Sequence, residues 1–180
     1  YADDWSGRAV NMRAGSGPNF SGTESVGGRT VVQNGLIFRY VRNKGVYLCP
    51  TDKGYPAKNC KQLSYQEQKE YPLSYAMNQN FWNDLGGGRF SMLSLDATVK
   101  TKDCLLLIHE TRYKLDAGRE TGINDGDFNW DPRRGGIDIP NDVHYDGSTV
   151  SFVDGHVRWM SYKEMMKARD LRLWEPIFGK

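Results

Sequence analysis

The chain has 180 residues, a length typical of one domain, and we expect residues 1–180 to form a single unit. A formal net charge of +2 is too small and too dispersed for a nucleic-acid-binding protein. No stretch approaches the roughly 20 apolar residues that a membrane-spanning helix needs. Ten Tyr and five Trp are many for this length, and such amphipathic rings are typical of half-buried surfaces and subunit contacts.

The first half of the chain predicts a loop followed by short elements. Residues 1–33 are polar and rich in Gly and Ser, which indicates an extended segment on the surface. Leu36, Ile37, Tyr40 and Val41 share one helical face, so we expect a short helix that Gly45 ends. Residues 46–48 and 74–77 predict two short strands.

The middle of the chain predicts one buried strand between long loops. Residues 105–109 begin with a continuous apolar run, which is typical of a central strand buried on both faces. Residues 51–72 are a polar insertion, and residues 113–141 are dense in Asp, Gly and Asn, so we expect both segments to be loops.

Two Asp-Gly pairs near the C-terminus predict a three-stranded antiparallel meander. Asp146-Gly147 and Asp154-Gly155 separate alternating segments, and Asp-Gly favours the positive φ angles of a two-residue hairpin turn. In that register one face of the meander is apolar and needs a covering element. This predicted apolar face consists of Val143, Val150, Phe152, Val157 and Trp159. The opposite face is expected to carry His144, Ser151 and Arg158.

The last element is a helix with a clear start. Ser161 and Glu164 form a capping box, which predicts a helix from residue 162 to about Leu173, with Pro176 beyond its end. The fold class that follows is α+β, with a small antiparallel sheet, long loops and a C-terminal helix.

The three cysteines are Cys49, Cys60 and Cys104. Cys49 and Cys60 bracket a loop rich in Pro, Gly, Lys and Asn, which predicts a disulfide in an oxidising compartment. A Cys49–Cys104 pairing stays open. A zinc site is the weaker interpretation, because the chain has no CxxC pair and only three His. Cys104 precedes an apolar run and otherwise predicts a buried free thiol.

One acidic segment predicts a metal-binding loop. Oxygen side chains stand there at alternate positions, as in a calcium loop, and the four candidate ligands are Asp125, Asp127, Asn129 and Asp131. Trp130 occupies the place of the EF-hand glycine, and the final Glu of that motif is missing, so an EF-hand is excluded. An irregular Ca²⁺ loop and a solvated Asx-turn loop are the two interpretations.

The histidines give no catalytic motif. His109-Glu110 begins like HExxH, but residue 113 is Tyr, which excludes that zinc site. A metal site formed by His144, Asp154 and His156 is less favoured than turn geometry, in which Asp154 accepts backbone N–H bonds and His144 bonds a neighbouring loop. We therefore expect no catalytic residues and predict that the protein is not an enzyme.

The segment HYDGSTVSFVDGHVRWM contains His144, nine further residues and then Asp154-Gly155. It resembles the prepilin-type processing-associated H-X9-DG domain of bacterial type IV pilin-like and type II secretion pseudopilin-like proteins. Further segments resemble this family in the same order along the chain. They are YADD at 1–4, GLIFRYV at 35–41, VYLCPTD at 46–52, SYAMN at 74–78 and LLIHE at 106–110.

This resemblance implies the head of a pilus-like or pseudopilus-like filament subunit. Residues 1–4 would follow a long apolar helix that anchors the subunit in the inner membrane and then packs in the filament. It would also cover the apolar face of the sheet, a task that the helix predicted at 162–173 could share. The partners would be like or unlike subunits, in a periplasmic or extracellular filament, with membrane contact only through that helix. The structural turn motif would consist of His144, Asp146, Gly147, Asp154 and Gly155.

The alternative interpretation is a secreted module that binds carbohydrate or another surface with the help of calcium. Its ligand would rest on exposed aromatic rings, for which the candidates are Trp82, Tyr113 and Trp130.

Overall fold

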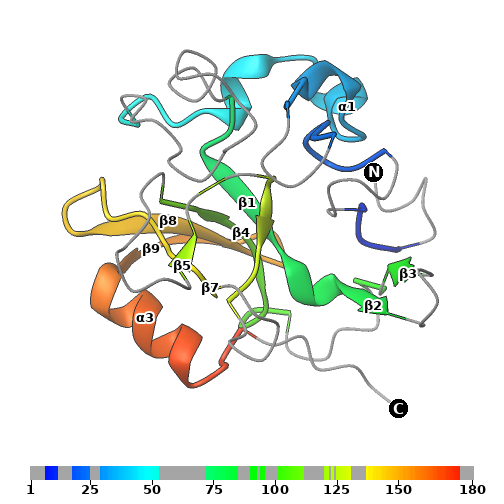
Figure 1. Ribbon diagram of the computed structural model, residues 1–180. Helices are drawn as coiled ribbons and strands as arrows, with labels where there is room; N and C mark the ends of the chain where they lie inside the picture. The colour runs from blue at the N-terminus through cyan, green and yellow to red at the C-terminus, as the bar shows by residue number, and fades with distance from the viewer. Residues whose placement is uncertain are drawn as a thin grey trace.

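The computed structural model describes residues 7–11, 18–24, 29–52, 72–84, 90–92, 94–95, 101–111, 120–121, 123, 125–130 and 137–174. Within these residues a five-stranded mixed sheet is combined with a C-terminal helix (Figure 1). The α+β class predicted from the sequence is confirmed. None of the helices in this part of the chain is long and apolar enough to cross a membrane.

The elements are short apart from β8 and the last helix. The helical segments are η2 (Val32–Asn34), α1 (Phe38–Val41), η3 (Lys44–Tyr47), η4 (Gln79–Phe81) and α3 (Tyr162–Asp170). The first strands are β1 (Tyr75–Asn78), β2 (Trp82–Asp84), β3 (Phe90–Met92) and β4 (Leu105–His109). The later strands are β5 (Glu120–Thr121), β6 (Asp127–Phe128), β7 (Ile137–Asp138), β8 (Gly147–Phe152) and β9 (Val157–Ser161).

The main sheet has the strand order β6-β1-β4-β8-β9. Strand β6 runs parallel to β1, and the other three pairings are antiparallel. The apolar run at 105–109 is the central strand β4, as predicted, and the strand expected at 74–77 is β1. Two other expectations were wrong. The strand expected at 46–48 is absent, because residues 44–47 form a 3-10 helix whose start is capped by the Asn43 side chain, which accepts the Gly45 N–H. The segment at 113–141, predicted to be a loop, contains β5, β6 and β7.

The C-terminal meander was predicted with one strand too many. Strands β8 and β9 form a hairpin, but the other neighbour of β8 is β4, which comes from much earlier in the chain. Val143 makes only an isolated bridge to Gly147, and that bridge is parallel. The segment before β8 is therefore a turn and not a third antiparallel strand.

The register of the hairpin also differs from the prediction. The loop holds three residues, 153–155, because Phe152 N–H donates to His156 O, and Gly155 adopts φ +88° at its end. Val150 therefore pairs with Arg158, and Ser151 pairs with Val157. A shift of one residue moves a whole strand to the other face. Val150 and Phe152 are buried, whereas Val157 and Trp159 are 60% and 50% exposed on the opposite face.

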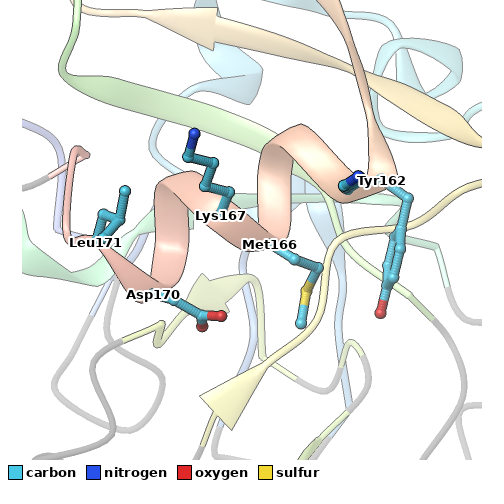
Figure 2. A pocket seen from close by; sticks show the side chains of 6 residues that line it. Tyr162, Met166, Lys167, Asp170 and Leu171 are labelled. Carbon is cyan, nitrogen blue, oxygen red and sulfur yellow. The ribbon is translucent and has the colours of Figure 1, made fainter.

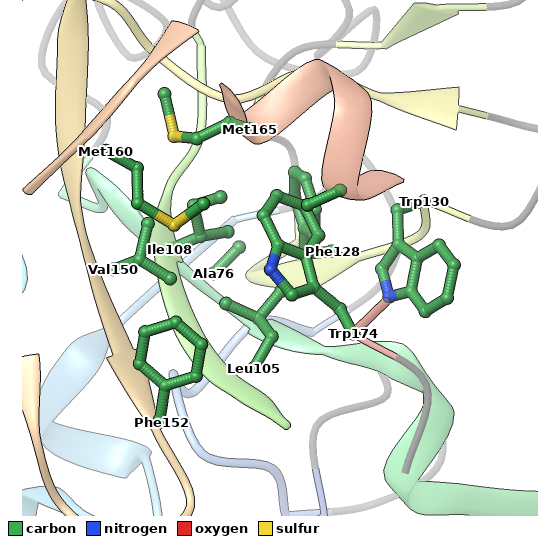
Figure 3. Close-up of a cluster of buried hydrophobic side chains, with 11 residues drawn as sticks. Ala76, Leu105, Ile108, Phe128, Trp130, Val150, Phe152, Met160, Met165 and Trp174 are labelled. Atoms are coloured by element: carbon green, nitrogen blue, oxygen red, sulfur yellow. The ribbon is translucent and has the colours of Figure 1, made fainter. Parts of the chain in front are cut away.

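The C-terminal helix covers the buried face of the sheet. The side chain of Ser161 accepts the Glu164 N–H and so caps the start of α3, as the capping box predicts. Met165 and Trp174 then pack against Val150 and Phe152 of β8 (Figure 3). No helix from outside this chain is required on that face, since α3 and the residues after it supply its cover.

Candidate functional site

Three metal-ligand side chains from distant segments meet at one end of the sheet. They are Cys49, His109 and His144, and one ligand atom of each lies within 4.8 Å of the others. His109 is the last residue of β4, Cys49 follows η3, and His144 lies in the turn before β8. Among the described residues this is the one group of three or more His, Cys, Asp or Glu placed closely enough to hold a metal ion.

Direct contacts define the centre of this cluster. The sulfur of Cys49 lies 3.1 Å from Nε2 of His144. Nε2 of His109 lies 3.4 Å from Oδ2 of Asp52, and both of these side chains are almost fully buried. The rings of His109 and His144 have their centroids 5.8 Å apart. The cluster therefore joins a thiol, two imidazoles and a carboxylate.

The hydroxyl of Ser74 fixes the loop that carries Cys49 and Asp52. It accepts the Cys49 backbone N–H at 3.0 Å and donates to Oδ2 of Asp52 at 2.8 Å. The loop is also closed on itself, since Asp52 N–H donates to Cys49 O at 3.0 Å. Because Ser74 directly precedes β1, the sheet positions both Cys49 and Asp52.

The turn that carries His144 is held by a tryptophan. Tyr145 and Asp146 both have φ near +56°, so the turn lies one residue before the predicted Asp146-Gly147 pair. The indole of Trp159 lies so close to Gly147 that a Cβ there would stand 2.5 Å from the ring. Nε1 of the same indole donates to the carbonyl of His144 at 2.8 Å. Trp159 thereby fixes the backbone of His144.

Asn141 and Tyr75 complete the surroundings of His109. Asn141 donates its backbone N–H to His109 O at 2.8 Å, and its amide nitrogen lies 3.3 Å from His109 Nε2. The ring of Tyr75 stands 5.3 Å from that of His109. Burial first, and then the neighbouring Cys49 and Asp52, raise the pKa of the Tyr75 phenol to about 12. The phenol therefore stays neutral beside these groups.

Two kinds of chemistry use a thiol beside imidazoles. A cysteine nucleophile needs a neighbouring base, which His144 could be, together with access for a substrate. Cys49 is only 3% exposed, so a substrate would have no direct path to its sulfur. A metal ion needs deprotonated sulfur and nitrogen ligands that converge, and it does not need an open face. The geometry favours metal binding.

Among the described residues, the predicted calcium ligands Asp125 and Asp127 belong to no such group. Oδ1 of Asp125 accepts the Asp127 N–H at 2.9 Å, which is the geometry of an Asx turn. Oδ2 of Asp127 accepts from Gln79 Nε2 at 3.2 Å, and Asn129 N–H donates to Asp138. Asp131 lies outside the described residues. Burial raises the pKa of the Asp125 carboxyl to about 6, against the lowering effect of the Asp127 N–H bond.

The cysteines differ from the predicted disulfide. Cys49 is a buried free thiol, and Cys60 lies outside the described residues. Cys104 is a second buried free thiol in this structure. Burial raises the pKa of the Cys104 thiol to about 12, as is typical of an inert core cysteine.

The remaining predicted site residues act in turns or in the core. Oδ1 of Asp154 accepts the His156 N–H at 3.1 Å, which confirms its role in the hairpin loop. The hydrogen bond from the His156 ring lowers the pKa of the Asp154 carboxyl. Trp130 is buried and donates to Asn78 Oδ1 at 3.0 Å, so it cannot hold a carbohydrate. Tyr113 and the side chain of Trp82 lie outside the described part.

A second feature is an apolar groove of about 480 Å³ on the sheet face opposite α3. Its floor contains Met77 and Leu107, which pair with each other across β1 and β4. Its walls come from the helical segments and from the start of the chain, and they include Ala9, Val10, Phe20, Ile37, Val41 and Val46. Almost all of its lining is apolar, so the groove is suited to an apolar occupant and not to a charged ligand.

A shallower hollow lies on the outside of α3. Figure 2 shows Tyr162 and Met166 extending from the same side of this helix. The charged residues Lys163, Lys167 and Asp170 share the hollow. Its polar groups do not converge on one point, so it offers a contact surface and no chemistry.

Comparison with protein-family models, with curated proteins and with solved structures finds no match for this chain. The resemblance to the H-X9-DG family therefore stays a hypothesis based on sequence motifs. The structure adds a spatial relationship between those motifs. VYLCPTD supplies Cys49 and Asp52, and SYAMN supplies Ser74 and Tyr75. LLIHE supplies His109, H-X9-DG supplies His144, and all of these side chains meet at the cluster.

The sequence interpretation separated Cys49, His109 and His144 and assigned each to a different local role. One signal could have connected them. Each of the three residues lies next to a predicted strand or turn. Where antiparallel strands pair, the end of one strand lies beside the start of its neighbour, so residues at these positions can meet at one end of the sheet. The strand order, which places β4 beside both β1 and β8, was needed to see this.

Proposed function

We propose that this chain is the head of a structural subunit in a type IV pilus-like or type II secretion pseudopilus-like filament. The observation that carries the proposal is the apolar groove on the sheet face opposite α3. Its occupant would be an apolar helix that precedes this sequence. Val41 and Val46 at the rim of the groove are 38% and 49% exposed, whereas Ala9, Val10 and Phe20 beneath them are buried.

The position of the groove supports this occupant. Ala9 and Val10, near the start of the chain, line it directly, so a segment that precedes them would arrive at the groove without a long connection. An α-helix with its side chains is roughly 10 Å wide and buries a stripe of apolar residues. The proposal therefore keeps the covering helix that the resemblance implies and moves it to the other face of the sheet.

The exposed side of the hairpin supports subunit contacts. Val157 and Trp159 point away from the core, and Tyr145 in the adjacent turn is 96% exposed. Aromatic and branched side chains in such a patch are typical of protein–protein interfaces. The calcium-dependent binding module has less support, since Trp130 belongs to the core and Asp125 forms an Asx turn.

A pair of double variants tests the proposal. Cells would produce the protein from its whole gene, and the amount of subunit in sheared surface filaments or in the membrane would be measured. Val41→Glu with Val46→Glu places charges at the groove and should strongly reduce assembly while changing the melting temperature of the 180-residue chain little. Leu171→Glu with Leu173→Glu, at comparably exposed positions after α3, is the control and should assemble normally.

Equal assembly of both double variants would contradict the groove assignment. A conventional signal peptide cleaved directly before Tyr1, instead of a leader followed by about 20 apolar residues, would contradict the filament class itself.

A further inference from the structure

We propose that Cys49, His109 and His144 bind one zinc ion, with the carboxylate of Asp52 as the fourth ligand. The ion would join the loop after η3, the end of β4 and the turn before β8 into one unit. This role is structural and separate from the occupant of the apolar groove, since the cluster uses polar side chains at the end of the strands and the groove uses apolar side chains on their face.

The donor atoms fit zinc. Zinc favours thiolate sulfur, imidazole nitrogen and carboxylate oxygen in a four-coordinate tetrahedron. Calcium requires six to eight oxygen ligands, and the cluster does not supply them. Copper centres of the His₂Cys type have a long axial contact and no strong fourth ligand, whereas Asp52 stands beside His109 with a carboxylate oxygen.

The ligand atoms of Cys49, His109 and His144 lie within 4.8 Å of one another, and Asp52 lies outside that group, so the four ligands would have to draw together to form a tetrahedron. With ordinary zinc bond lengths, neighbouring nitrogen and oxygen ligands are about 3.4 Å apart, and sulfur and nitrogen about 3.5 Å. The observed His109 Nε2 to Asp52 Oδ2 distance is 3.4 Å. The observed Cys49 Sγ to His144 Nε2 distance is 3.1 Å, so these two atoms would move apart by a few tenths of an ångström.

Burial gives the site a reason to take up a cation. His109 is fully buried, and its Nε2 faces Oδ2 of Asp52. The side chain of Asp52 is 3% exposed. A buried carboxylate next to a thiol is costly without a positive charge, and a divalent ion would neutralise the carboxylate and the thiolate together.

The surroundings hold the ligands as a metal site requires. Ser74 bonds both Cys49 and Asp52, and Trp159 bonds the carbonyl of His144. Partners of this kind orient metal ligands and change metal affinity by about 10- to 100-fold when they are removed.

The test uses the 180-residue chain after metal removal with a chelator under reducing conditions. Calorimetric titration with zinc chloride should give one site, and zinc should raise the melting temperature. Cobalt(II) should give a thiolate-to-cobalt charge-transfer band and the visible bands of a tetrahedral ion, because Cys49 supplies the one sulfur ligand. Titration with calcium chloride should produce no heat at this site.

Two ligand variants and two controls locate the ion. Cys49→Ser should abolish the cobalt–thiolate band, and His144→Ala, in a half-buried turn that tolerates substitution, should weaken zinc binding by about tenfold or more. His156→Ala and Cys104→Ala remove a histidine and a cysteine outside the cluster, and they should leave zinc affinity unchanged. If Cys49→Ser does not fold, His144→Ala with the cobalt spectrum still decides the outcome.

Three results would overturn the proposal. The first is no zinc-dependent shift in melting temperature together with no cobalt–thiolate band. The second is zinc binding of equal strength in the His144→Ala and His156→Ala variants. The third is a Cys49–Cys60 disulfide in protein isolated from its native compartment, seen as a mass about 2 Da below that of the reduced chain, because a disulfide removes the thiolate ligand.

Discussion

The sulfur of Cys49 lies 3.1 Å from Nε2 of His144, although 95 positions of chain separate the two residues. The contact joins the loop after η3 to the turn before β8, and the sheet holds both ends in place through Ser74 and Trp159. It lies at one end of the strands, and the apolar groove lies across the face of β1 and β4. The fold therefore combines a polar cluster that fixes loops with an apolar groove on the sheet face opposite α3.

The same substitution, Val to Thr, can be made on each face of the hairpin, and its effects on the free energy of unfolding can be compared. Val150→Thr places a hydroxyl in the core and should lower the free energy of unfolding by about 1–3 kcal/mol. Val157→Thr, on the exposed face, should change it by less than about 0.5 kcal/mol. Urea denaturation followed by circular dichroism measures both values. Equal losses would instead support a two-residue turn, in which both valines share one face.

The two glycines of the Asp-Gly pairs serve different physical needs. Gly155 has φ +88° with open space around it, so Gly155→Ala should cost about 1 kcal/mol through backbone strain alone. At Gly147 a Cβ would lie 2.3 Å from the Met160 carbonyl and would displace the Trp159 indole. Gly147→Ala should therefore cost more, about 2–3 kcal/mol.

Thermal or urea unfolding of both alanine variants measures this difference. Thr149→Ala, an exposed change in the same strand, is the control. A smaller loss for Gly147→Ala than for Gly155→Ala would show that Trp159 does not lie over the strand as described.

Asp125 should make stability depend on pH in an unusual direction. Burial raises the folded-state pKa of its carboxyl from the ordinary 3.8 to about 6. The contribution of this group to stability is therefore fully present below about pH 4 and is lost as the pH rises through about 6. The loss should be on the order of 3 kcal/mol.

Asp125→Asn keeps an oxygen that can accept the Asp127 N–H and cannot ionise. Unfolding free energies of the two proteins between pH 4 and 7 should therefore diverge, with the variant the less pH-dependent. Parallel curves would mean that Asp125 is charged in the fold, as a calcium ligand would be.

Local signals in the sequence predicted part of this fold correctly. The capping pair Ser161 and Glu164 starts α3, and the apolar run at 105–109 forms the central strand β4, because both features depend on neighbouring residues alone. The hairpin register was not predictable in the same way. Asp154-Gly155 fits both a two-residue turn and the end of a three-residue loop, and the two alternatives exchange the faces of β9.

The cluster could not be predicted because its parts meet only through long-range pairing. His109 approaches the loop of Cys49 since β4 pairs with β1, and His144 joins them since β8 pairs with β4. The make-up of the predicted apolar face was wrong for a related reason. The one-residue shift places Val157 and Trp159 outside, and α3 then suffices for Val150 and Phe152.

Site-specific photo-cross-linking tests the filament-head account most directly. A photoreactive phenylalanine analogue would replace Val46 at the groove, or Lys163 on α3 as the control, in protein made from the whole gene. The account predicts that Val46 cross-links to an apolar peptide encoded upstream of Tyr1, identified by mass spectrometry, and that Lys163 does not. The account would be contradicted if the analogue at Val46 formed no cross-link to such a peptide in protein that is assembled at the membrane.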